Sequence, residues 1–153
     1  MSVAFRRDSD EEHLEPRFDR PIPPGPNLVT QRGHDLIRAR TEELEAAIPS
    51  AASEEQRAEL QRDLRYWRVR LATAQVAPTP SGDVVAFGKC VPLEQNGRVR
   101  SLCIVGHDEA DPASGLIGFA SPLAQALMGA EAGEEIAVPG PNGDVRLISI
   151  EPA

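Results

Sequence analysis

The chain has 153 residues, of which 16 are basic and 24 are acidic, and its formal net charge is -8. This length accommodates one domain or two small ones, and the acidic balance argues against a protein that coats nucleic acid or anionic membranes through charge alone. No run approaches the ~18 apolar residues of a membrane-spanning helix, the charged N-terminus is unlike a secretory signal, and two cysteines are too few for a secreted disulfide scaffold. We therefore expect a cytoplasmic protein that does not bind membranes.

The charge is unevenly distributed along the chain. Residues 30–76 carry eight acids and eight bases, whereas residues 77–153 carry ten acids and four bases. Residues 1–27 are polar and end in a proline-rich run, which favours extended backbone and blocks helix formation. We predict a flexible acidic tail at 1–27, followed by two structural units.

Residues 28–76 have the apolar period of two helices. Thr30 is the expected N-cap of the first helix, which ends at Pro49. Ser53 opens the second helix, and Gln56 completes a capping box. Apolar positions recur at spacings of three and four, at Ile37, Thr41, Leu44 and Ile48 in the first helix and at Leu60, Leu64, Trp67, Leu71 and Ala74 in the second. We predict a short antiparallel coiled-coil hairpin whose seam packs on itself.

After a linker at 77–82, the apolar period changes to two, which is typical of strands. Asn96-Gly97 predicts a two-residue hairpin turn, and Ser121-Pro122 predicts the start of a short helix that ends near residue 129. The expected strands are 84–87, 89–93, 99–105, 116–119, 135–138 and 145–150, with a turn at 141–143 joining the last two. The chain as a whole is predicted to be α+β, a helical hairpin followed by a small sheet domain with one short helix.

Several motifs in this chain are specific. They are Ile104-Val105-Gly106, Asp108-Glu109-Ala110-Asp111, Leu116-Ile117 and Ser121-Pro122-Leu123-Ala124, followed by Gly133, Glu135, Pro141 and Gly143, and, in the hairpin, Thr30-Gln31-Arg32-Gly33 and Ala72-Thr73-Ala74-Gln75-Val76. Together they resemble the bacterial GreA/GreB transcript-cleavage factors over about residues 28–151. The resemblance implies an FKBP-like antiparallel sheet domain at 83–153.

The resemblance also implies a partner and a mechanism. The C-terminal domain of this family docks on the rim of the secondary channel of RNA polymerase, and the coiled coil enters the channel. Acidic side chains at its tip help to hold a catalytic magnesium ion, for which carboxylates are suitable hard ligands, and backtracked RNA is cut. We expect the same partner here, a monomer without a cofactor or metal of its own, and no sequence-specific nucleic acid binding.

The hairpin tip departs from the family pattern. The turn at residues 47–53, which includes Pro49 and Ser53, contains no acidic residue, and the arms are short for the family. The nearest acids, Glu54 and Glu55, are interpreted as first-turn residues favoured by the helix dipole. We therefore predict an elongation regulator that does not stimulate cleavage, similar to short-hairpin relatives such as the regulators of nucleoside diphosphate kinase. The alternatives are a cleavage factor that uses Glu54 or Glu55, and an interaction module that does not bind polymerase.

The part of the family motif nearest to the polymerase rim comprises Phe119, Ala120, Ser121, Pro122 and Leu123. Ser121 and Pro122 also suit a helix cap and first turn, and we expect both roles. Relatives often have a polar or acidic residue before the Ser-Pro pair, so Ala120 predicts a weaker contact with polymerase.

A second motif, Gly106 to Asp111, superficially resembles a metal cluster because His107, Asp108, Glu109 and Asp111 lie within five residues. The family match indicates a structural loop between strands, and we predict no metal there.

The turn at Asn96-Gly97 places Cys90 opposite Cys103, at a distance that a disulfide could bridge. We expect reduced thiols in a reducing cytoplasm, with a redox-sensitive cross-strand bridge as the alternative.

An isomerase activity, which the FKBP fold can carry, would need an aromatic-walled pocket. Residues 77–153 contain only Phe87 and Phe119 as aromatics, and no nucleophile–base motif is recognisable. We do not expect an enzyme.

Overall fold

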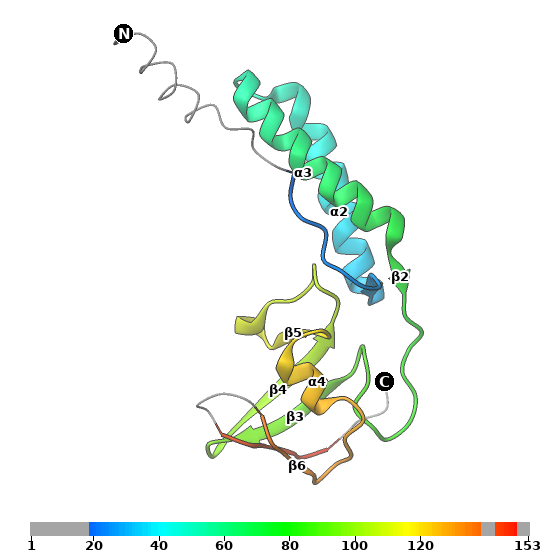
Figure 1. The fold of residues 1–153 in the computed structure, drawn as a ribbon, viewed down its shortest axis with the longest axis vertical. Coiled ribbons are helices and arrows are strands. Elements are labelled where there is room, and N and C mark those ends of the chain that lie inside the picture. The colour runs from blue at the N-terminus through cyan, green and yellow to red at the C-terminus, as the bar shows by residue number, and fades with distance from the viewer. Residues whose placement is uncertain (1–18, 139–142, 150–153) are drawn as a thin grey trace, which may run out of the picture.

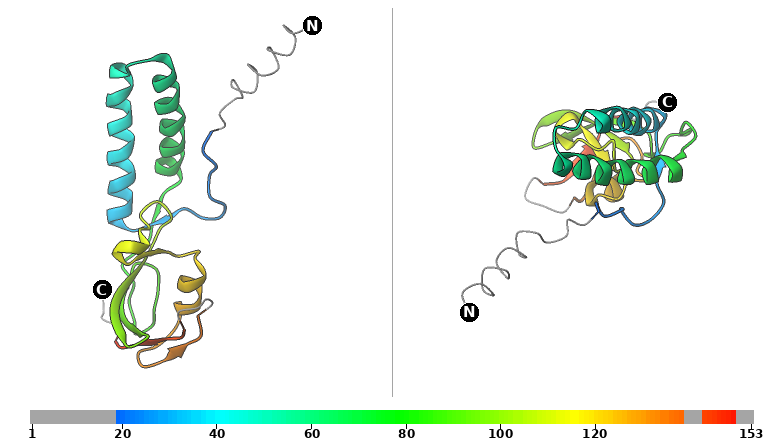
Figure 2. Two further views of the ribbon diagram at one scale, coloured as in Figure 1. Left: turned by 90° about the vertical axis from the view of Figure 1, so that its left-hand side faces the viewer. Right: turned by 90° about the horizontal axis from the view of Figure 1, so that it is seen from above.

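The computed structural model describes residues 19–138 and 143–149. A helical hairpin extends from a small sheet domain, and the hairpin tip is the end farthest from the sheet (Figures 1 and 2). The sheet domain carries one short helix, so the predicted α+β organisation is confirmed. No helix within the described ranges combines the length and the apolar composition that a membrane span requires.

The hairpin consists of α2 (Gln31–Ala47), a 3-10 turn η1 (Ile48–Ser50) and α3 (Glu54–Thr73). Thr30 and Ser53 cap the two helices as predicted, each accepting a hydrogen bond from the backbone amide three residues later. The Gln56 side chain accepts from the amide of Ala52 rather than from that of Ser53, which differs by one residue from a standard capping box.

The predicted seam forms the hairpin core. Ile37, Leu44, Leu64 and Trp67 are buried there, and Ile48, Leu60, Leu71 and Ala74 pack around them. At the base, β1 (Leu28–Val29) and β2 (Gln75–Val76) pair in parallel and hold together the two ends of the hairpin. Strands this short have no periodicity of their own, so the sequence did not predict them.

The segment 19–27 lies along α3. Asp19 pairs with Arg65 at 2.6 Å, and the Arg20 guanidinium lies 4.0 Å from the centre of the Tyr66 ring. The Asn27 side chain donates to the carbonyl of Arg70 at 2.8 Å. Residues 19–27 therefore contact α3 in this structure, while residues 1–18 lie outside the described part of the chain.

The sheet has the strand order β5-β4-β3-β7-β6. Its strands are β3 (Cys90–Gln95), β4 (Arg98–Val105), β5 (Leu116–Gly118), β6 (Glu135–Ile136) and β7 (Val145–Leu147). β5 runs parallel to β4 whereas the other pairs are antiparallel. The sheet is therefore mixed, and not wholly antiparallel as expected, because the loop 106–115, with its 3-10 turn η2 (Pro112–Ser114), crosses back before β5 begins.

Other boundaries differ from the expected ones. Residues 84–87 are not a strand, because Val84 makes only an isolated bridge with Glu131. The last two strands are shorter than predicted, and the turn at 141–143 lies mainly outside the described residues.

The short helix α4 (Pro122–Leu127) begins as predicted, with Ser121 as its N-cap. It packs its apolar side on the sheet, where Val91, Leu93, Leu102, Ile104, Ala124, Leu127, Val145 and Leu147 form the core. The sheet domain thus has its own core, separate from that of the hairpin.

Candidate functional site

The base of the hairpin is fixed to the sheet domain by a buried carboxylate on the loop after β4. Asp108 accepts hydrogen bonds from the Tyr66 hydroxyl at 2.5 Å and from Nε of Arg70 at 2.6 Å. The side chains of Asp108 and Arg70 are each only 4% exposed. Arg70 also donates to the Asn27 side chain at 2.7 Å, so the buried charges are paired and hydrogen-bonded. Asp108 therefore attaches α3 to the sheet domain.

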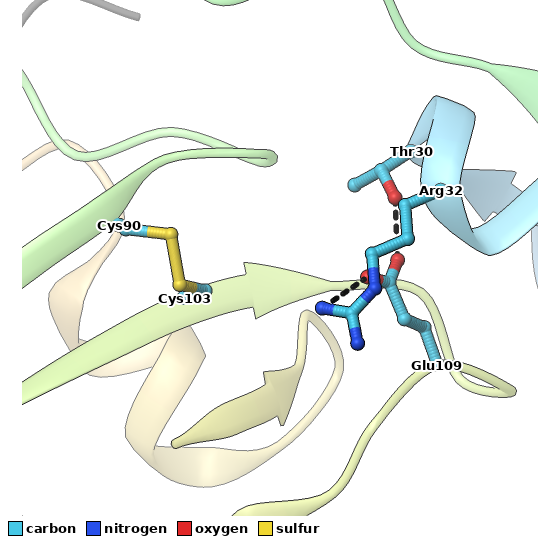
Figure 3. The surroundings of a disulfide bond; sticks show 5 residues. All are labelled: Thr30, Arg32, Cys90, Cys103 and Glu109. Carbon is cyan, nitrogen blue, oxygen red and sulfur yellow. Dashed lines mark hydrogen bonds and ion pairs between the residues drawn. A yellow bond between two sulfur atoms is a disulfide. The ribbon is translucent and has the colours of Figure 1, made fainter. Parts of the chain in front are cut away.

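The neighbouring residue, Glu109, attaches α2. Its carboxylate accepts a hydrogen bond from the Thr30 hydroxyl and lies 3.9 Å from the Arg32 guanidinium (Figure 3). Glu109 is buried and sits at the N-terminus of α2, where the helix dipole favours a negative charge. Adjacent carboxylates thus hold both arms of the hairpin.

Two glycines permit this close approach. A Cβ atom on Gly33 would lie 2.8 Å from Oε1 of Glu109, and one on Gly106 would lie 2.4 Å from the carbonyl oxygen of Leu28. Any other residue at Gly106 would push its Cβ atom against the backbone of Leu28, so the loop and the hairpin base fit only with glycine there.

Burial and the hydrogen bond to Asp108 raise the pKa of Tyr66 to about 12, since both disfavour the tyrosinate. Tyr66 is therefore neutral and acts as a hydrogen-bond donor at physiological pH.

These contacts give the motif Gly106 to Asp111 its role. Gly106, Asp108 and Glu109 contact the hairpin base, whereas Asp111 is exposed and accepts a hydrogen bond from the Ser114 hydroxyl at 2.7 Å. His107 is exposed. In the described part of the chain, no three or more metal-ligating side chains converge.

The opposite end of the hairpin is different. Pro49 and Ser53 are exposed, and the turn between the helices has no carboxylate. The Glu54 side chain is 88% exposed and pairs with Arg57 one turn along α3. Glu55 is also exposed.

The segment from Phe119 to Leu123, which we name the elbow, connects β5 to α4. The amide of Phe119 donates to the carbonyl of Val105 at 2.9 Å, and the Phe119 ring stacks edge-on against Phe87 with centroids 5.5 Å apart. Ala120 and Pro122 are exposed, whereas Phe119, Ser121 and Leu123 are half-buried. The elbow therefore presents a small surface on a well-supported backbone.

The register of β3 and β4 places Cys90 directly opposite Cys103, as the turn at Asn96-Gly97 predicted. The two residues form a disulfide, with their Cα atoms 3.9 Å apart (Figure 3). The expectation of free thiols is wrong for this structure.

Sequence reasoning missed Tyr66, Arg70 and Asn27. Arg70 follows Tyr66 by four residues and therefore lies on the same face of α3. That spacing, together with an acidic loop elsewhere in the chain, is the signal that could have suggested a buried ion pair.

The fold and these contacts define a class of protein that holds a short helical hairpin in a fixed direction on a small mixed-sheet domain. Residues 79–152 match the family model described as "Transcription elongation factor, GreA/GreB, C-term". The chain belongs to the GreA/GreB family.

Relatives match the hairpin as well as the sheet domain. "Transcription elongation factor GreA" of Desulfovibrio desulfuricans is 42% identical over 123 residues, covering 78% of this chain and 66% of the relative. The GreA of Nitratidesulfovibrio vulgaris is 38% identical over 130 residues, with 81% and 70% covered. The GreA of Helicobacter pylori is 36% identical over 124 residues, with 78% and 73% covered. The chain thus spans about two thirds of the length of these relatives.

Solved structures that match this chain include GreA factor homolog 1 (Gfh1) of Thermus thermophilus, at 21% identity and a TM-score of 0.41, with 83% of this chain and 99% of that chain covered. A GreA/GreB factor from Nitrosomonas europaea is 22% identical with a TM-score of 0.39, covering 80% and 97%.

Proposed function

We propose that the protein binds bacterial RNA polymerase at the rim of the secondary channel and regulates elongation without stimulating transcript cleavage. It acts as a monomeric cytoplasmic cofactor of polymerase and catalyses no reaction itself. Support for the partner comes from the relatives, which are named transcription elongation factor GreA and of which this chain spans about two thirds.

The elbow is the proposed contact with the polymerase rim. Its exposed residues, Ala120 and Pro122, lie on a backbone that Ser121 and Phe119 hold in place through a helix cap and a strand hydrogen bond. A surface that is ordered before binding loses little conformational entropy on docking. The sheet domain has an excess of acidic residues, so a basic surface on polymerase would complement it.

The hairpin is the part that would occupy the channel. The 20 residues of α3 span about 30 Å, and the junction with Asp108 and Glu109 fixes its direction. The observation that carries the proposal is the tip, where the turn has no carboxylate and Glu54 is engaged by Arg57. A tip whose turn lacks a carboxylate is poorly suited to holding a magnesium ion at the polymerase active site, because carboxylates are the preferred hard ligands of that ion.

A binding measurement with elbow variants tests the docking surface. Ala120→Arg places a bulky cation on the proposed interface, and we expect it to weaken binding to purified bacterial core polymerase by about tenfold, or ~1.4 kcal/mol. Ala132→Arg, at an exposed position in the loop before β6, is the matched control and should bind as the unmodified protein does. Ala120→Asp should bind about threefold more tightly.

The proposal is contradicted if the unmodified protein does not bind polymerase, or if Ala120→Arg and Ala132→Arg bind equally well. Either result would favour an interaction module with another partner.

A further inference from the structure

We propose that the Cys90–Cys103 disulfide is a redox-sensitive staple that keeps the elbow ordered, and that its reduction by a dithiol loosens the elbow. The consequence for polymerase affinity rests on the proposed docking function. The ordering effect does not, because it concerns contacts within the chain.

The disulfide joins the two segments that contact Phe119 of the elbow, namely the loop leading into β3 and the strand β4. Cys90 is the first residue of β3, and the loop that leads into it carries Phe87. Cys103 lies in β4, two residues before Val105, whose carbonyl holds the amide of Phe119. The disulfide therefore joins the strand that follows Phe87 to the strand that bonds to Phe119, and the rings of Phe87 and Phe119 form an edge-on pair at the first residue of the elbow.

The loop before β3 is anchored at Val85, which is buried in the core, donates its amide to the carbonyl of Ala130 at 2.9 Å and accepts from the amide of Gly129 at 2.8 Å. The rest of the loop leads from Val85 to Cys90. It is not a regular strand, and its backbone is joined to β4 through Gly88, which donates to the carbonyl of Ile104 at 2.8 Å, and through Lys89, whose carbonyl accepts from the amide of Ile104 at 3.0 Å. Lys89 is buried, and its ammonium group donates to the carbonyl of Gly82 within the same loop. This internal bond shapes the loop but does not attach it to β4. At the end of the loop next to β3, the covalent link at Cys90 therefore adds to the two backbone hydrogen bonds with Ile104.

The disulfide is also accessible to a reductant. Cys90 is exposed and Cys103 is partly exposed, both on the side of the strands away from the core residues Val91 and Leu102. A disulfide in contact with solvent can exchange with external thiols, whereas a fully buried one is protected from them.

The exchange balances as a two-electron reduction. A thiolate of the dithiol attacks Sγ of Cys90, the Cys90–Cys103 bond breaks, and Cys103 leaves as a thiolate that takes up a proton. The second thiol of the dithiol, as a thiolate, then attacks the other sulfur atom of the dithiol, which is bonded to Sγ of Cys90 in the mixed disulfide. Cys90 is released as a thiolate and is protonated, while the dithiol becomes a cyclic disulfide.

Hydrogen exchange of the full-length protein, oxidised or reduced with dithiothreitol, tests the staple directly. We expect reduction to accelerate exchange of the amides of Gly88 and Phe119 by about tenfold or more, since both lie next to the released strand ends. The amides of His34 and Gln75, which bond within the hairpin base, should be unchanged and serve as internal controls. The variant Cys90→Ser/Cys103→Ser should resemble the reduced protein and should not respond to dithiothreitol.

Polymerase affinity measured on the same samples provides the second readout. We expect reduction to weaken binding about threefold in the unmodified protein, through the loss of preorganisation, and to leave the double variant unchanged. Unchanged exchange at Gly88 and Phe119 on reduction overturns the proposal. Accelerated exchange with no polymerase binding in either state contradicts the docking function alone and supports the staple.

Discussion

The two ends of the hairpin are built in opposite ways. At the base, Asp108 and Glu109 are buried, hydrogen-bonded and paired with cations from both helices. At the tip, the turn has no carboxylate, and the first acid after it, Glu54, is exposed on the surface of α3. The chain therefore uses its buried acids to set the direction of the hairpin and places none in the turn itself.

This difference separates two properties that a factor of this type could combine. Directing a hairpin requires a rigid junction, and buried charge pairs provide one because breaking either partner is costly. Chemistry at the tip requires acids that converge on one point. The protein has a rigid junction built from buried charge pairs. This property suits the proposed regulator, which would act by its presence in the channel.

We expect the largest loss of stability from a substitution at Asp108. Asp108→Ala leaves Arg70 buried without its carboxylate, and we expect the free energy of unfolding to fall by about 3–5 kcal/mol. Urea unfolding, followed through the fluorescence of Trp67, the only tryptophan, measures this loss. Asp83→Ala, at an exposed position, is the matched control and should change stability by less than about 0.5 kcal/mol. A loss below about 1 kcal/mol in Asp108→Ala would show that the junction is not a buried ion pair.

We expect the next largest loss of stability from a substitution at Gly106, where the loop and the hairpin base lie close together. The Cβ atom of Gly106→Ala would collide with the carbonyl of Leu28, and the required shift should cost about 2 kcal/mol. Gly118→Ala is the control, because its Cβ atom would make an ordinary 3.8 Å contact with Ala110. Equal stability of the two variants would contradict the close packing described for the hairpin base.

Loss of the Tyr66 hydroxyl removes one hydrogen bond to a charged acceptor but keeps the ring. We expect Tyr66→Phe to lower the free energy of unfolding by about 1.5 kcal/mol at neutral pH. The same urea experiment measures it, and a neutral or stabilising effect would mean that Asp108 is satisfied without Tyr66.

The raised pKa of Tyr66 makes a separate prediction about pH. Because the folded protein holds the neutral form more strongly than the unfolded chain does, the associated stability is present below pH ~10 and is lost as pH rises towards about 12. Tyr66 is the only tyrosine, so its ultraviolet titration can be followed without ambiguity. We expect a midpoint near 12 in the unmodified protein and a lower one, still above 10, in Asp108→Asn, where the charge is removed and burial remains. A midpoint near 10 in the unmodified protein would argue that the ring is solvated.

A substitution at the hairpin tip should have the smallest effect on the free energy of unfolding. Glu54→Gln removes a surface ion pair with Arg57, and we expect a change in unfolding free energy of no more than about 0.5 kcal/mol. A larger loss would mean that Glu54 has a structural role that its exposure does not indicate.

The sequence predicted the elements whose physics is local. The spacing of Ile37, Leu44, Leu64 and Trp67 determined the hairpin, and the side chains of Thr30, Ser53 and Ser121 marked the helix starts, because caps and amphipathic periods depend on residues a turn or two apart. The Asn96-Gly97 turn gave the correct register of Cys90 and Cys103 because a two-residue loop leaves only one pairing.

The features that the sequence did not predict depend on contacts between distant residues. Asp108 meets Tyr66 and Arg70 across the boundary between the two units, and no local pattern indicates that pairing. The parallel pairing of β5 with β4 likewise depends on the path of the loop between them, and the segment 19–27 lies on α3 through side chains that are 46 residues apart at Asp19 and Arg65.

The central claim is that the protein occupies the polymerase channel without stimulating cleavage. The most direct test adds saturating amounts of it to stalled, backtracked bacterial elongation complexes and follows the length of the RNA, with a cleavage-active GreA as the positive control. We predict no shortening of the RNA above the rate of polymerase alone, and slower shortening by GreA when the two factors compete. Robust shortening that is lost in Glu54→Ala or Glu55→Ala would contradict the account and would place catalytic acids at the hairpin tip after all.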